Sequence, residues 1–368
     1  MKKIPFVNFK KQWHQEKKDI LKITDRVFSD GFFVNGRDVE RFEKNIIKKY
    51  HYKDCIALNS GTDALTLGLM NIGVRKGDEV ITQPNSFIAS TGSIVHIGAK
   101  PIFADVLNNQ LIDPKKVEEK ITKKTKAIMT VHLSGSMSNV EEMKKISKKY
   151  SIPLIEDAAQ SIGSSYKSIY SGAWGDVGCF SAHPLKNLNA SGDSGFIVTS
   201  QYNSLKKLRV TRNHGLKTRD KLDHFGYVSR MDTLQAAILN YRLGNLKKVI
   251  QKRKDNAKLY LQLLENSGIY LPKEDTKEFH TYHNFIIQLR NRNKLKKYLS
   301  ENGIETLIHY SIPIHLQVGA KYLGLKKGMY PIAEKQSKQI LSLPINQYLK
   351  EQDIEYICSK IKKFVKNN

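Results

Sequence analysis

The chain has 368 residues, of which 40% are hydrophobic, and a formal net charge of +26. This composition excludes a disordered or fibrous protein, and the length is enough for a large domain and a smaller one. Its three cysteines, Cys55, Cys179 and Cys358, lie far apart in the sequence, which fits reduced thiols in a reducing compartment better than a disulfide framework or a metal site.

The N-terminal segment, MKKIPFVNFKKQWHQEKKDI, begins with lysines and predicts a helix without the apolar core of a secretory signal. No later stretch approaches the roughly 18 apolar residues that a membrane span needs. We therefore expect a soluble, cytoplasmic protein with no membrane partner.

Short apolar runs then alternate with helical stretches. Most runs are continuously apolar, which is typical of strands covered on both faces, and their alternation with helices predicts an α/β domain with a mostly parallel sheet. The runs are CIALNS (55–60), EVITQP (79–84), KPIFADV (100–106), KAIMTVHL (126–133), IPLIEDAA (152–159), DVGCFSA (176–182) and GFIVTS (195–200).

The pattern changes near residue 240. A long basic helix, at about 232–266, leads to the segments YHNFIIQLR and IETLIHYSIPIH, which predict a small α+β domain. We expect a large domain over 1–240, including the N-terminal helical segment, and a small C-terminal domain over 241–368.

The lysines raise the possibility of nucleic-acid binding, since clustered cations neutralise phosphates. However, they are scattered among apolar residues at helical spacing, as in EEMKKISKKY and LGNLKKVIQKRKDNAK. This spacing indicates the solvated faces of amphipathic helices. We expect no nucleic-acid partner, but a positive field that attracts an anionic substrate such as a nucleotide diphosphate.

Ligands of open α/β sheets bind at the carboxyl ends of the strands, so the residues after each run are candidates for a site. Ser60, Gly61 and Thr62 follow the first run and open an apolar helix. Free backbone N–H groups and hydroxyls at a helix start can bind phosphate. The alternative is an ordinary helix cap with a glycine turn.

Two further strand ends carry ionisable groups. Asp157 ends a buried run, where a carboxylate needs a cationic partner such as a protonated pyridine nitrogen, and Gln160 follows one turn later. Lys186 follows the run 176–182 among small and neutral residues. A partly desolvated lysine has a lowered pKa, and its neutral amine can form a Schiff base with an aldehyde. The alternatives are a helix-capping aspartate and a surface lysine.

Phe87 lies just beyond the second run, where an aromatic face can stack on a flat cofactor ring or belong to the core. A phosphate site, a stacking aromatic ring, a buried aspartate and a reactive lysine are together what pyridoxal 5′-phosphate (PLP) needs.

In these residues and their order the sequence resembles the DegT/StrS family of PLP-dependent nucleotide-sugar aminotransferases, which have the aspartate-aminotransferase type I fold. The resemblance covers nearly the whole chain. The matching blocks include GRDVERFE, ALNSGTDAL, GDEVITQPNSFIAS, GAKPIFADV, VHLSGSMSNVEEM, IEDAAQSIGSSYKSIYSGAWGDVGCFS, KNLNASGDSGFIVT, RNHG, SRMDTLQAAIL and HYSIPIHLQ.

The resemblance implies roles for individual residues. Lys186 would bind the cofactor covalently and then act as base and acid in the proton transfer, and Asp157 would keep the pyridine nitrogen protonated. Phe87 would stack on the ring and Gln160 would lie near its phenolic oxygen. The implied phosphate ligands are Gly61, Thr62 and Ser181, with Ser60 beside them.

Family members are homodimers in which the neighbouring subunit completes each site. Many of them have an asparagine before the RMD block, where this chain has Val228, so Ser229 or Arg230 is the expected substitute for the contact across subunits. His183 stands where relatives often have a tyrosine. We expect it either to donate a proton or contact the sugar, or to shape the turn before Pro184.

His309, Tyr310 and His315 match a family block that approaches the sugar, and we take them as substrate candidates. The implied reaction transfers an amino group, from L-glutamate as in the family, to a nucleotide-linked keto sugar. The NLNASGDSG block after Lys186 resembles relatives acting on 3-keto sugars, so we favour C3 over C4.

Three other functions are weighed against this one. Related C3 dehydratases replace the lysine by histidine or add an iron–sulfur cluster, and the presence of Lys186 and the dispersed cysteines argue against both variants. A DNA-binding regulator would use the basic surface, although the sequence shows no helix-turn-helix appendage. The last alternative is an inactive structural subunit.

Overall fold

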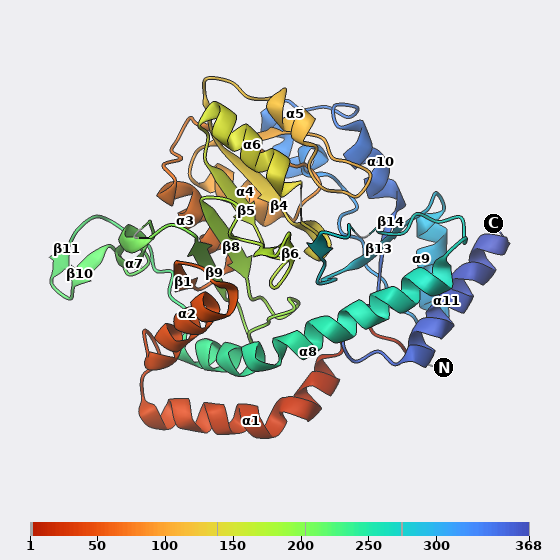
Figure 1. The fold of residues 1–368 in the computed structure, drawn as a ribbon, viewed down its shortest axis with the longest axis horizontal. Helices are drawn as coiled ribbons and strands as arrows, with labels where there is room; N and C mark the ends of the chain where they lie inside the picture. Colours follow the sequence, from red (N-terminus) through yellow and green to blue (C-terminus); the bar gives the residue numbers. More distant parts are fainter. Residues whose placement is uncertain (1–2, 138, 203, 274, 368) are drawn as a thin grey trace.

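The computed structural model of the chain describes residues 3–137, 139–202, 204–273 and 275–367. Its largest sheet has seven strands in the order β1-β9-β8-β5-β4-β2-β3, with helices on both faces (Figure 1). β9 runs antiparallel to both of its neighbours, and the other neighbouring strands are parallel. The predicted α/β class with a mostly parallel sheet is confirmed.

Each predicted run forms one strand of this sheet, and every strand ends before its run does. The last residues of the runs therefore lie in the loops beyond the carboxyl ends of the strands. The strands are β1 (Asp54–Leu58), β2 (Glu79–Thr82), β3 (Lys100–Phe103), β4 (Thr125–Val131), β5 (Leu154–Asp157), β8 (Val177–Ser181) and β9 (Gly195–Thr199).

The helices that follow in the chain cover both faces of the sheet or form the C-terminal part of the molecule. They are α1 (Phe9–Asp30), α2 (Arg37–Tyr50), α3 (Gly61–Asn71), α4 (Ile88–His96), α5 (Pro114–Glu118), α6 (Val140–Tyr150), α7 (Lys206–Thr211), α8 (Thr233–Leu264), α9 (Arg292–Glu301), α10 (Pro331–Gln339) and α11 (Glu351–Lys366). Within the described residues, none of these helices combines the length and apolar character needed to cross a bilayer.

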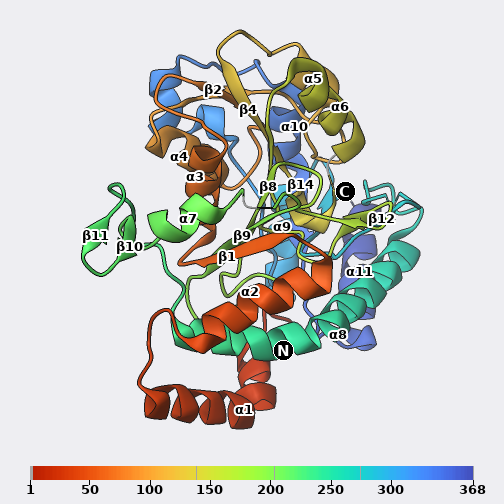
Figure 2. The same cartoon turned by 60° about the vertical axis from the view of Figure 1, so that its left-hand side comes forward.

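Smaller elements complete the fold. Figure 2 shows the hairpin β10–β11 projecting from the body of the molecule. The short elements are β6 (Ser165–Tyr166), β7 (Ile169–Tyr170), β10 (Leu216–Thr218), β11 (Lys221–Leu222), β12 (Glu278–Phe279), β13 (Phe285–Gln288) and β14 (Ile340–Leu343), with 3-10 turns η1 (Leu133–Gly135), η2 (Ile314–Leu316) and η3 (Val318–Leu323).

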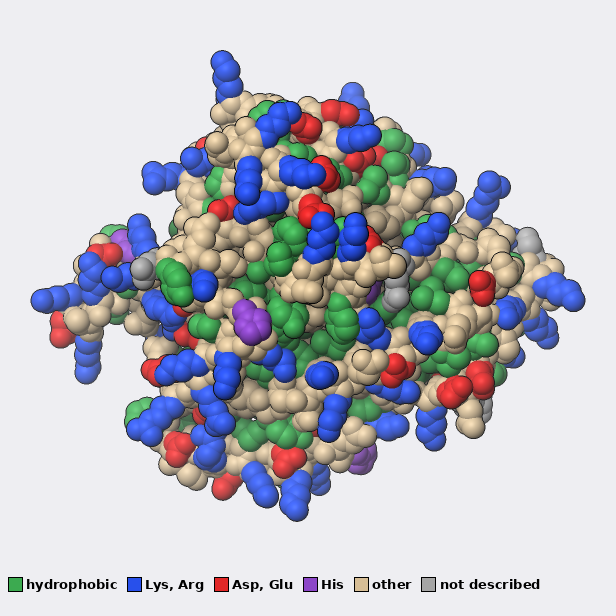
Figure 3. Space-filling view, viewed as in Figure 1, with side chains coloured by type: hydrophobic (Ala, Val, Ile, Leu, Met, Phe, Trp, Pro, Cys, Tyr) green, Lys and Arg blue, Asp and Glu red, His purple; other side chains and the backbone are tan. Residues whose placement is uncertain are grey.

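The basic side chains are distributed as the helical spacing predicts. Figure 3 shows lysine and arginine side chains over the whole visible face, interspersed with acidic ones. On α6, Met143 and Ile146 are buried while Lys145, Lys148 and Lys149 are exposed. Arg253 of α8 is an exception, because it is only 7% exposed.

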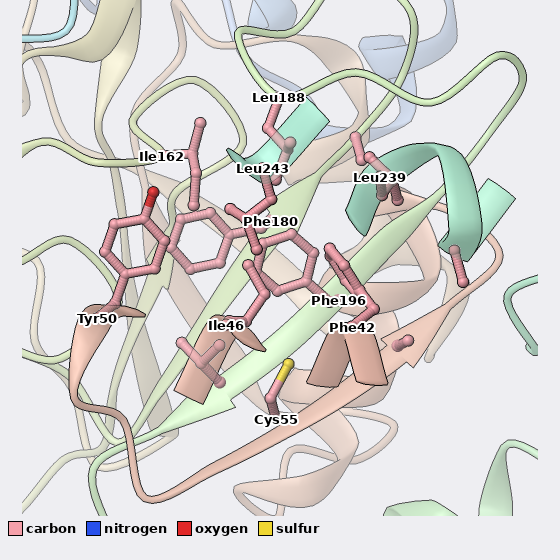
Figure 4. Packing of buried hydrophobic residues seen from close by; sticks show 14 of the residues in the cluster. Phe42, Ile46, Tyr50, Cys55, Ile162, Phe180, Leu188, Phe196, Leu239 and Leu243 are labelled. Carbon is pink, nitrogen blue, oxygen red and sulfur yellow. The ribbon is translucent and has the colours of Figure 1, made fainter. Parts of the chain in front are cut away.

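Successive residues of each strand contribute to cores on opposite faces of the sheet, since strand side chains alternate. On β5, Ile155 packs with residues of α3 and α4, whereas Leu154 packs with residues of α5 and α6. On the face toward α2 and α8, the rings of Phe180 and Phe196 stack with centroids 4.8 Å apart, and Phe42 meets Phe196 edge-on (Figure 4).

Helix α8 belongs to two cores. Leu239 packs in the core shared with α2, and Tyr260 packs in a C-terminal core with β13, β14 and α11. The predicted domain limit between 1–240 and 241–368 therefore lies inside a continuous helix. Ile4 also joins the C-terminal core and pairs with Ile304, so the N-terminal end packs with the smaller part of the molecule rather than with the large domain.

Glu156 of β5 holds the loop before β8. This side chain is fully buried, and its two oxygens accept hydrogen bonds from the backbone N–H groups of Gly172, Trp174 and Gly175 at 2.6–2.8 Å. Its Oε2 also lies 2.7 Å from Nε2 of His132, which we assign as the donor. Every Glu156 contact therefore uses the carboxylate as an acceptor.

We expect Glu156→Gln to destabilise the fold. In either orientation the amide would place an NH2 group against an N–H donor, which costs about 2–3 kcal/mol in the free energy of unfolding. Urea unfolding followed by circular dichroism measures this loss. Glu141→Gln is the matched control, since Glu141 makes a partly exposed salt bridge with Lys167 and should change little. Equal stability of both variants would contradict the role of Glu156.

Candidate functional site

The carboxyl ends of the strands open into a cavity of about 370 Å³. It collects side chains from segments that are far apart in the sequence. The predicted site residues that line it are Ser60, Gly61, Thr62, Phe87, Asp157, Gln160, Ser181, His183, Lys186, His309 and Tyr310. The loops after several strands thus meet at one place, as the strand-end pattern predicts.

One wall of the cavity is the start of α3. Ser60 caps this helix and accepts a hydrogen bond from the Asp63 N–H at 3.1 Å. A Cβ added to Gly61 would lie 2.6 Å from Cβ of Ser181, so only glycine allows the helix to start this close to the end of β8. The first N–H groups of a helix have no acceptor within it and favour an anion. This wall is therefore suited to a phosphate.

Asp157 ends β5 and is buried, with 4% of its surface exposed. The Ser90 hydroxyl donates to its Oδ2 at 2.6 Å, and the Ala159 N–H donates to its Oδ1 at 3.2 Å. Burial raises the pKa of this carboxyl, while the two hydrogen bonds and the charge of Lys186 oppose the rise. The site is arranged to hold one carboxylate opposite a cationic group.

Lys186 follows β8 after a tight turn in which its N–H donates to the His183 carbonyl at 2.8 Å. Burial of the amine lowers the pKa of Lys186 to about 8, although the charge of Asp157 acts in the opposite direction. Among the described residues, none makes a hydrogen bond or ion pair with this amine. A considerable fraction is therefore neutral and nucleophilic near neutral pH.

Aromatic and amide groups lie next to these ionisable groups. Phe87, at the start of α4, is 55% exposed, and its ring centroid lies 5.9 Å from that of Tyr310. The Gln160 Oε1 accepts from the Ser134 N–H at 2.7 Å, which leaves the amide N–H groups to act as donors. Burial raises the pKa of Tyr310, and the charge of Asp157 raises it further, so its hydroxyl stays protonated.

The two predicted histidines that line the cavity differ in their surroundings. His183 is exposed, and its Nδ1 accepts from the Leu185 N–H at 3.2 Å, which is the turn-shaping contact considered from the sequence. The Nδ1 of His309 lies 2.8 Å from the Ser342 hydroxyl. Burial and the charge of Lys186 lower the pKa of His309 to about 4, so it is neutral near pH 7.

Three predicted residues lie outside the cavity lining in the described part of this chain. His315 is buried against Glu334, with Nε2 and Oε1 3.1 Å apart, and therefore does not reach the position predicted for a substrate contact. Ser229 donates to Asn59 Oδ1 at 3.2 Å, and Arg230 donates to Asn213 Oδ1 at 3.1 Å. Neither residue contributes to the cavity of its own chain.

Sequence reasoning missed several cavity residues. Ser90 follows Phe87 by three positions, and this helical spacing would have indicated a shared face. Arg253 follows Ile250 by three positions and precedes Ala257 by four, and this helical spacing places it on the buried side of α8. No pattern indicated His283 and Asn284, which line the cavity from the C-terminal part of the chain.

These groups fit PLP, which the resemblance implied. The close approach of Gly61 to Ser181 leaves a narrow cradle of donors for the phosphate. Asp157 could pair with the ring nitrogen, and no described residue makes a hydrogen bond that would keep the Lys186 amine from an aldehyde. A phosphate site, a carboxylate and a reactive amine share one cavity.

Comparison with known proteins gives the same answer. The model of the DegT/DnrJ/EryC1/StrS aminotransferase family matches residues 14–362. A pleiotropic regulatory protein of Geobacillus stearothermophilus is 38% identical over 99% of both chains. The dTDP-3-amino-3,6-dideoxy-alpha-D-galactopyranose transaminase of Aneurinibacillus thermoaerophilus is 36% identical and covers 98% of this chain and 99% of its own.

Among solved structures, S. venezuelae DesV in complex with a ketimine intermediate superposes with a TM-score of 0.97 at 31% identity, covering 99% of both chains. The match covers nearly the whole length of both chains. The chain therefore belongs to the DegT/DnrJ/EryC1/StrS aminotransferase family.

Proposed function

We propose that this protein transfers an amino group from L-glutamate to C3 of a nucleotide-linked 3-keto sugar, in the biosynthesis of an amino sugar for a surface glycan. The observation that carries the proposal is the Lys186 amine, which has no hydrogen-bond partner among the described residues and a pKa of about 8, in the same cavity as the buried carboxylate of Asp157. A cytoplasmic location remains a prediction.

The choice of C3 is supported by a relative. The Aneurinibacillus protein, 36% identical to this chain, is a transaminase of a dTDP-3-amino sugar. The block after Lys186 independently favoured C3. The net charge of +26 would attract a nucleotide diphosphate to the protein.

The chemistry requires PLP, which supplies, when bound, an aldehyde that combines with amines and a ring that withdraws electrons from the carbon that exchanges its proton. The residues that would hold it are Ser60, Gly61, Thr62 and Ser181 at the phosphate. Phe87 would pack on the ring, and the N–H groups of Gln160 would face its oxygen. Asp157 would pair with the ring nitrogen.

Asp157 and Lys186 have separate tasks in this mechanism. The Ser90 hydroxyl and the Ala159 N–H hold Asp157 as an oriented acceptor, so its charge can keep a ring nitrogen protonated. The Lys186 amine, with its lowered pKa, could take a proton from the donor's reacting carbon and return one to the carbon of the cofactor's former aldehyde, on the other side of the shared nitrogen. Because Lys186 is flexible, one amine can serve both positions.

We also propose that the protein acts as a homodimer with shared sites. Ser229 and Arg230 do not line the cavity of their own chain, and they follow a segment with large exposed apolar side chains. In that segment Phe225 is 92% exposed, Tyr227 45% and Val228 52%. Covering such side chains is a common reason for association, and it would bring Ser229 and Arg230 toward a second cavity.

A regulatory role is the second candidate, because the Geobacillus relative is named as a pleiotropic regulatory protein. The basic side chains could then contact DNA. Figure 3 shows them interspersed with acidic residues on the visible face rather than gathered in one stripe. Tight, sequence-selective binding to duplex DNA at physiological salt would favour this candidate over catalysis.

The central experiment presents purified holoenzyme with L-glutamate and a panel of nucleotide-linked 3-keto and 4-keto sugars, with product identification by NMR. We expect amination at C3. Lys186→Ala should abolish turnover and prevent a borohydride-reduced cofactor adduct, whereas Lys167→Ala, a surface control, should do neither. Wild-type protein that stays colourless with PLP would refute the function, and amination at C4 alone would correct the regiochemistry.

We expect Asp157→Asn to slow the donor half-reaction at least about 100-fold, since the ring nitrogen would lose its anionic partner. Single-turnover absorbance of the cofactor measures the rate, and sedimentation velocity measures assembly. Asp176→Asn is the control. Asp176 accepts from the Leu154 N–H at 2.9 Å at the amino ends of β8 and β5, away from the cavity. Equal rates in the two variants would exclude the role of Asp157.

The pKa of Lys186, about 8, predicts how cofactor capture depends on pH. Acid protonates the amine and slows capture, so the rate should rise through pH 8 and reach a plateau, with about a tenth of the amine neutral at pH 7. Asp157→Asn should move the midpoint to lower pH, because the charge of Asp157 raises this pKa. Quench with borohydride and mass spectrometry give the rate. A midpoint above pH 10 would contradict burial of the amine.

A further inference from the structure

The cavity contains a second buried cation for which the mechanism above has no use. Arg253 projects from α8, is 7% exposed and lines the cavity. Its Nη1 donates to the carbonyl oxygens of Tyr282 and His283, both at 3.2 Å, and its Nη2 lies 3.5 Å from Gln347 Oε1. Within the described part of the chain, its Nε has no hydrogen-bond partner and no carboxylate forms a salt bridge with the guanidinium.

Two neighbouring polar groups are also buried without a hydrogen-bond partner among the residues that the structure describes. They are the Nδ1 of His283 and the Nδ2 of Asn284, and both residues line the same cavity. Burial, together with the charges of Lys186 and Arg253, holds the pKa of His283 well below its usual range. His283 is therefore neutral, and it lies close enough to Lys186 and Arg253 for their charges to lower its pKa.

A group of buried donors of this kind calls for an anionic ligand. A buried guanidinium without a counter-charge is costly, and so are buried donors without acceptors. The planar fork of an arginine matches the two oxygens of a carboxylate. The amide N–H of Asn284 and a His283 tautomer protonated on Nδ1 add donors for the same oxygens.

The position of the group selects which carboxylate binds there. In an α-amino acid the carboxylate and the amino group share one carbon atom, so a donor that reacts beside Lys186 must place its α-carboxylate within a few ångströms. The segment of His283 and Asn284 lies next to Lys186, since the side chain of the adjacent Asn187 donates to the Thr281 carbonyl at 3.1 Å.

We propose that Arg253, with Asn284 and His283, binds the α-carboxylate of the amino donor and so distinguishes α-amino acids from other amines. This inference rests on the proposed aminotransferase function and adds a donor subsite to it. The rival ligand is the diphosphate of the sugar nucleotide, which is larger and carries more charge than one nine-tenths buried guanidinium can match.

The test separates the two half-reactions of the holoenzyme. Arg253→Lys keeps the charge and removes the fork. We expect it to raise the apparent Kd for L-glutamate about 10- to 100-fold in single-turnover absorbance, and to leave the half-reaction with the nucleotide sugar unchanged. Arg292→Lys is the matched control. Arg292 is 4% exposed, donates to the carbonyls of Ile340 and Ser337, and does not line the cavity.

A substrate comparison identifies the carboxylate. 4-Aminobutyrate has the distal carboxylate and the amine of glutamate but lacks the α-carboxylate. The wild-type preference for L-glutamate over 4-aminobutyrate should therefore collapse in Arg253→Lys and persist in Arg292→Lys. Thermal shift with 2-oxoglutarate, which has no amine to react, gives a binding readout that does not depend on turnover.

A second variant guards against loss of folding. Asn284→Asp preserves shape and places a negative charge where an N–H donor stood, so it should weaken both L-glutamate and 2-oxoglutarate about tenfold or more. Unchanged donor binding in Arg253→Lys and Asn284→Asp, with active wild-type enzyme, would overturn the subsite alone. A defect confined to the sugar half-reaction would assign the group to the diphosphate instead. Wild-type holoenzyme that ignores glutamate would refute the function itself.

Discussion

The site depends on one electrostatic constraint, which is that a carboxylate and an amine share a cavity from which water is largely removed. Burial favours the neutral form of both groups, raising the pKa of Asp157 and lowering that of Lys186, while the charge of each favours ionisation of the other. Burial and the partner's charge therefore act in opposite directions at both groups, and at Lys186 the result is a pKa of about 8. Surface residues of the same types could not do this, because solvent would restore their ordinary behaviour.

The fold satisfies this constraint by using two neighbouring residues of β5 for opposite purposes. Side chains alternate along a strand, so Glu156 and Asp157 point to different faces of the sheet. The Glu156 carboxylate accepts hydrogen bonds from the backbone of the loop before β8, the strand that leads to Lys186. Among the described residues, Asp157 accepts from two donors, Ser90 and Ala159, and remains available to a ligand. The hydrogen bonds of Glu156 thus hold in place β5, the strand from which Asp157 projects.

The sequence predicted the parts of the molecule that depend on local order. Apolar runs marked the strands, and because strand ends collect at one edge, the residues after them predicted Asp157, Lys186 and the start of α3. The HYSIPIH block predicted a substrate contact for His315 as well as for His309. The chain turns between these two residues, and His315 packs against Glu334 instead. Arg253, His283 and Asn284 come from segments that only tertiary packing brings together, and the many solvated lysines around Arg253 concealed its place on the buried side of α8.

The contrast between the surface and the cavity explains why the net charge is a poor guide to the ligand. A charge of +26 spread over the surface attracts every anion alike. Selection has to occur inside, where the charged side chains that line the cavity in the described chain are Asp157, Lys186, Asp193 and Arg253. With Lys186 bound to the cofactor and Asp157 paired with its ring, Arg253 would be the remaining cation that this chain contributes to the cavity. A donor carboxylate that enters beside Lys186 would pair with this guanidinium, so donor selection depends on Arg253 rather than on the basic surface.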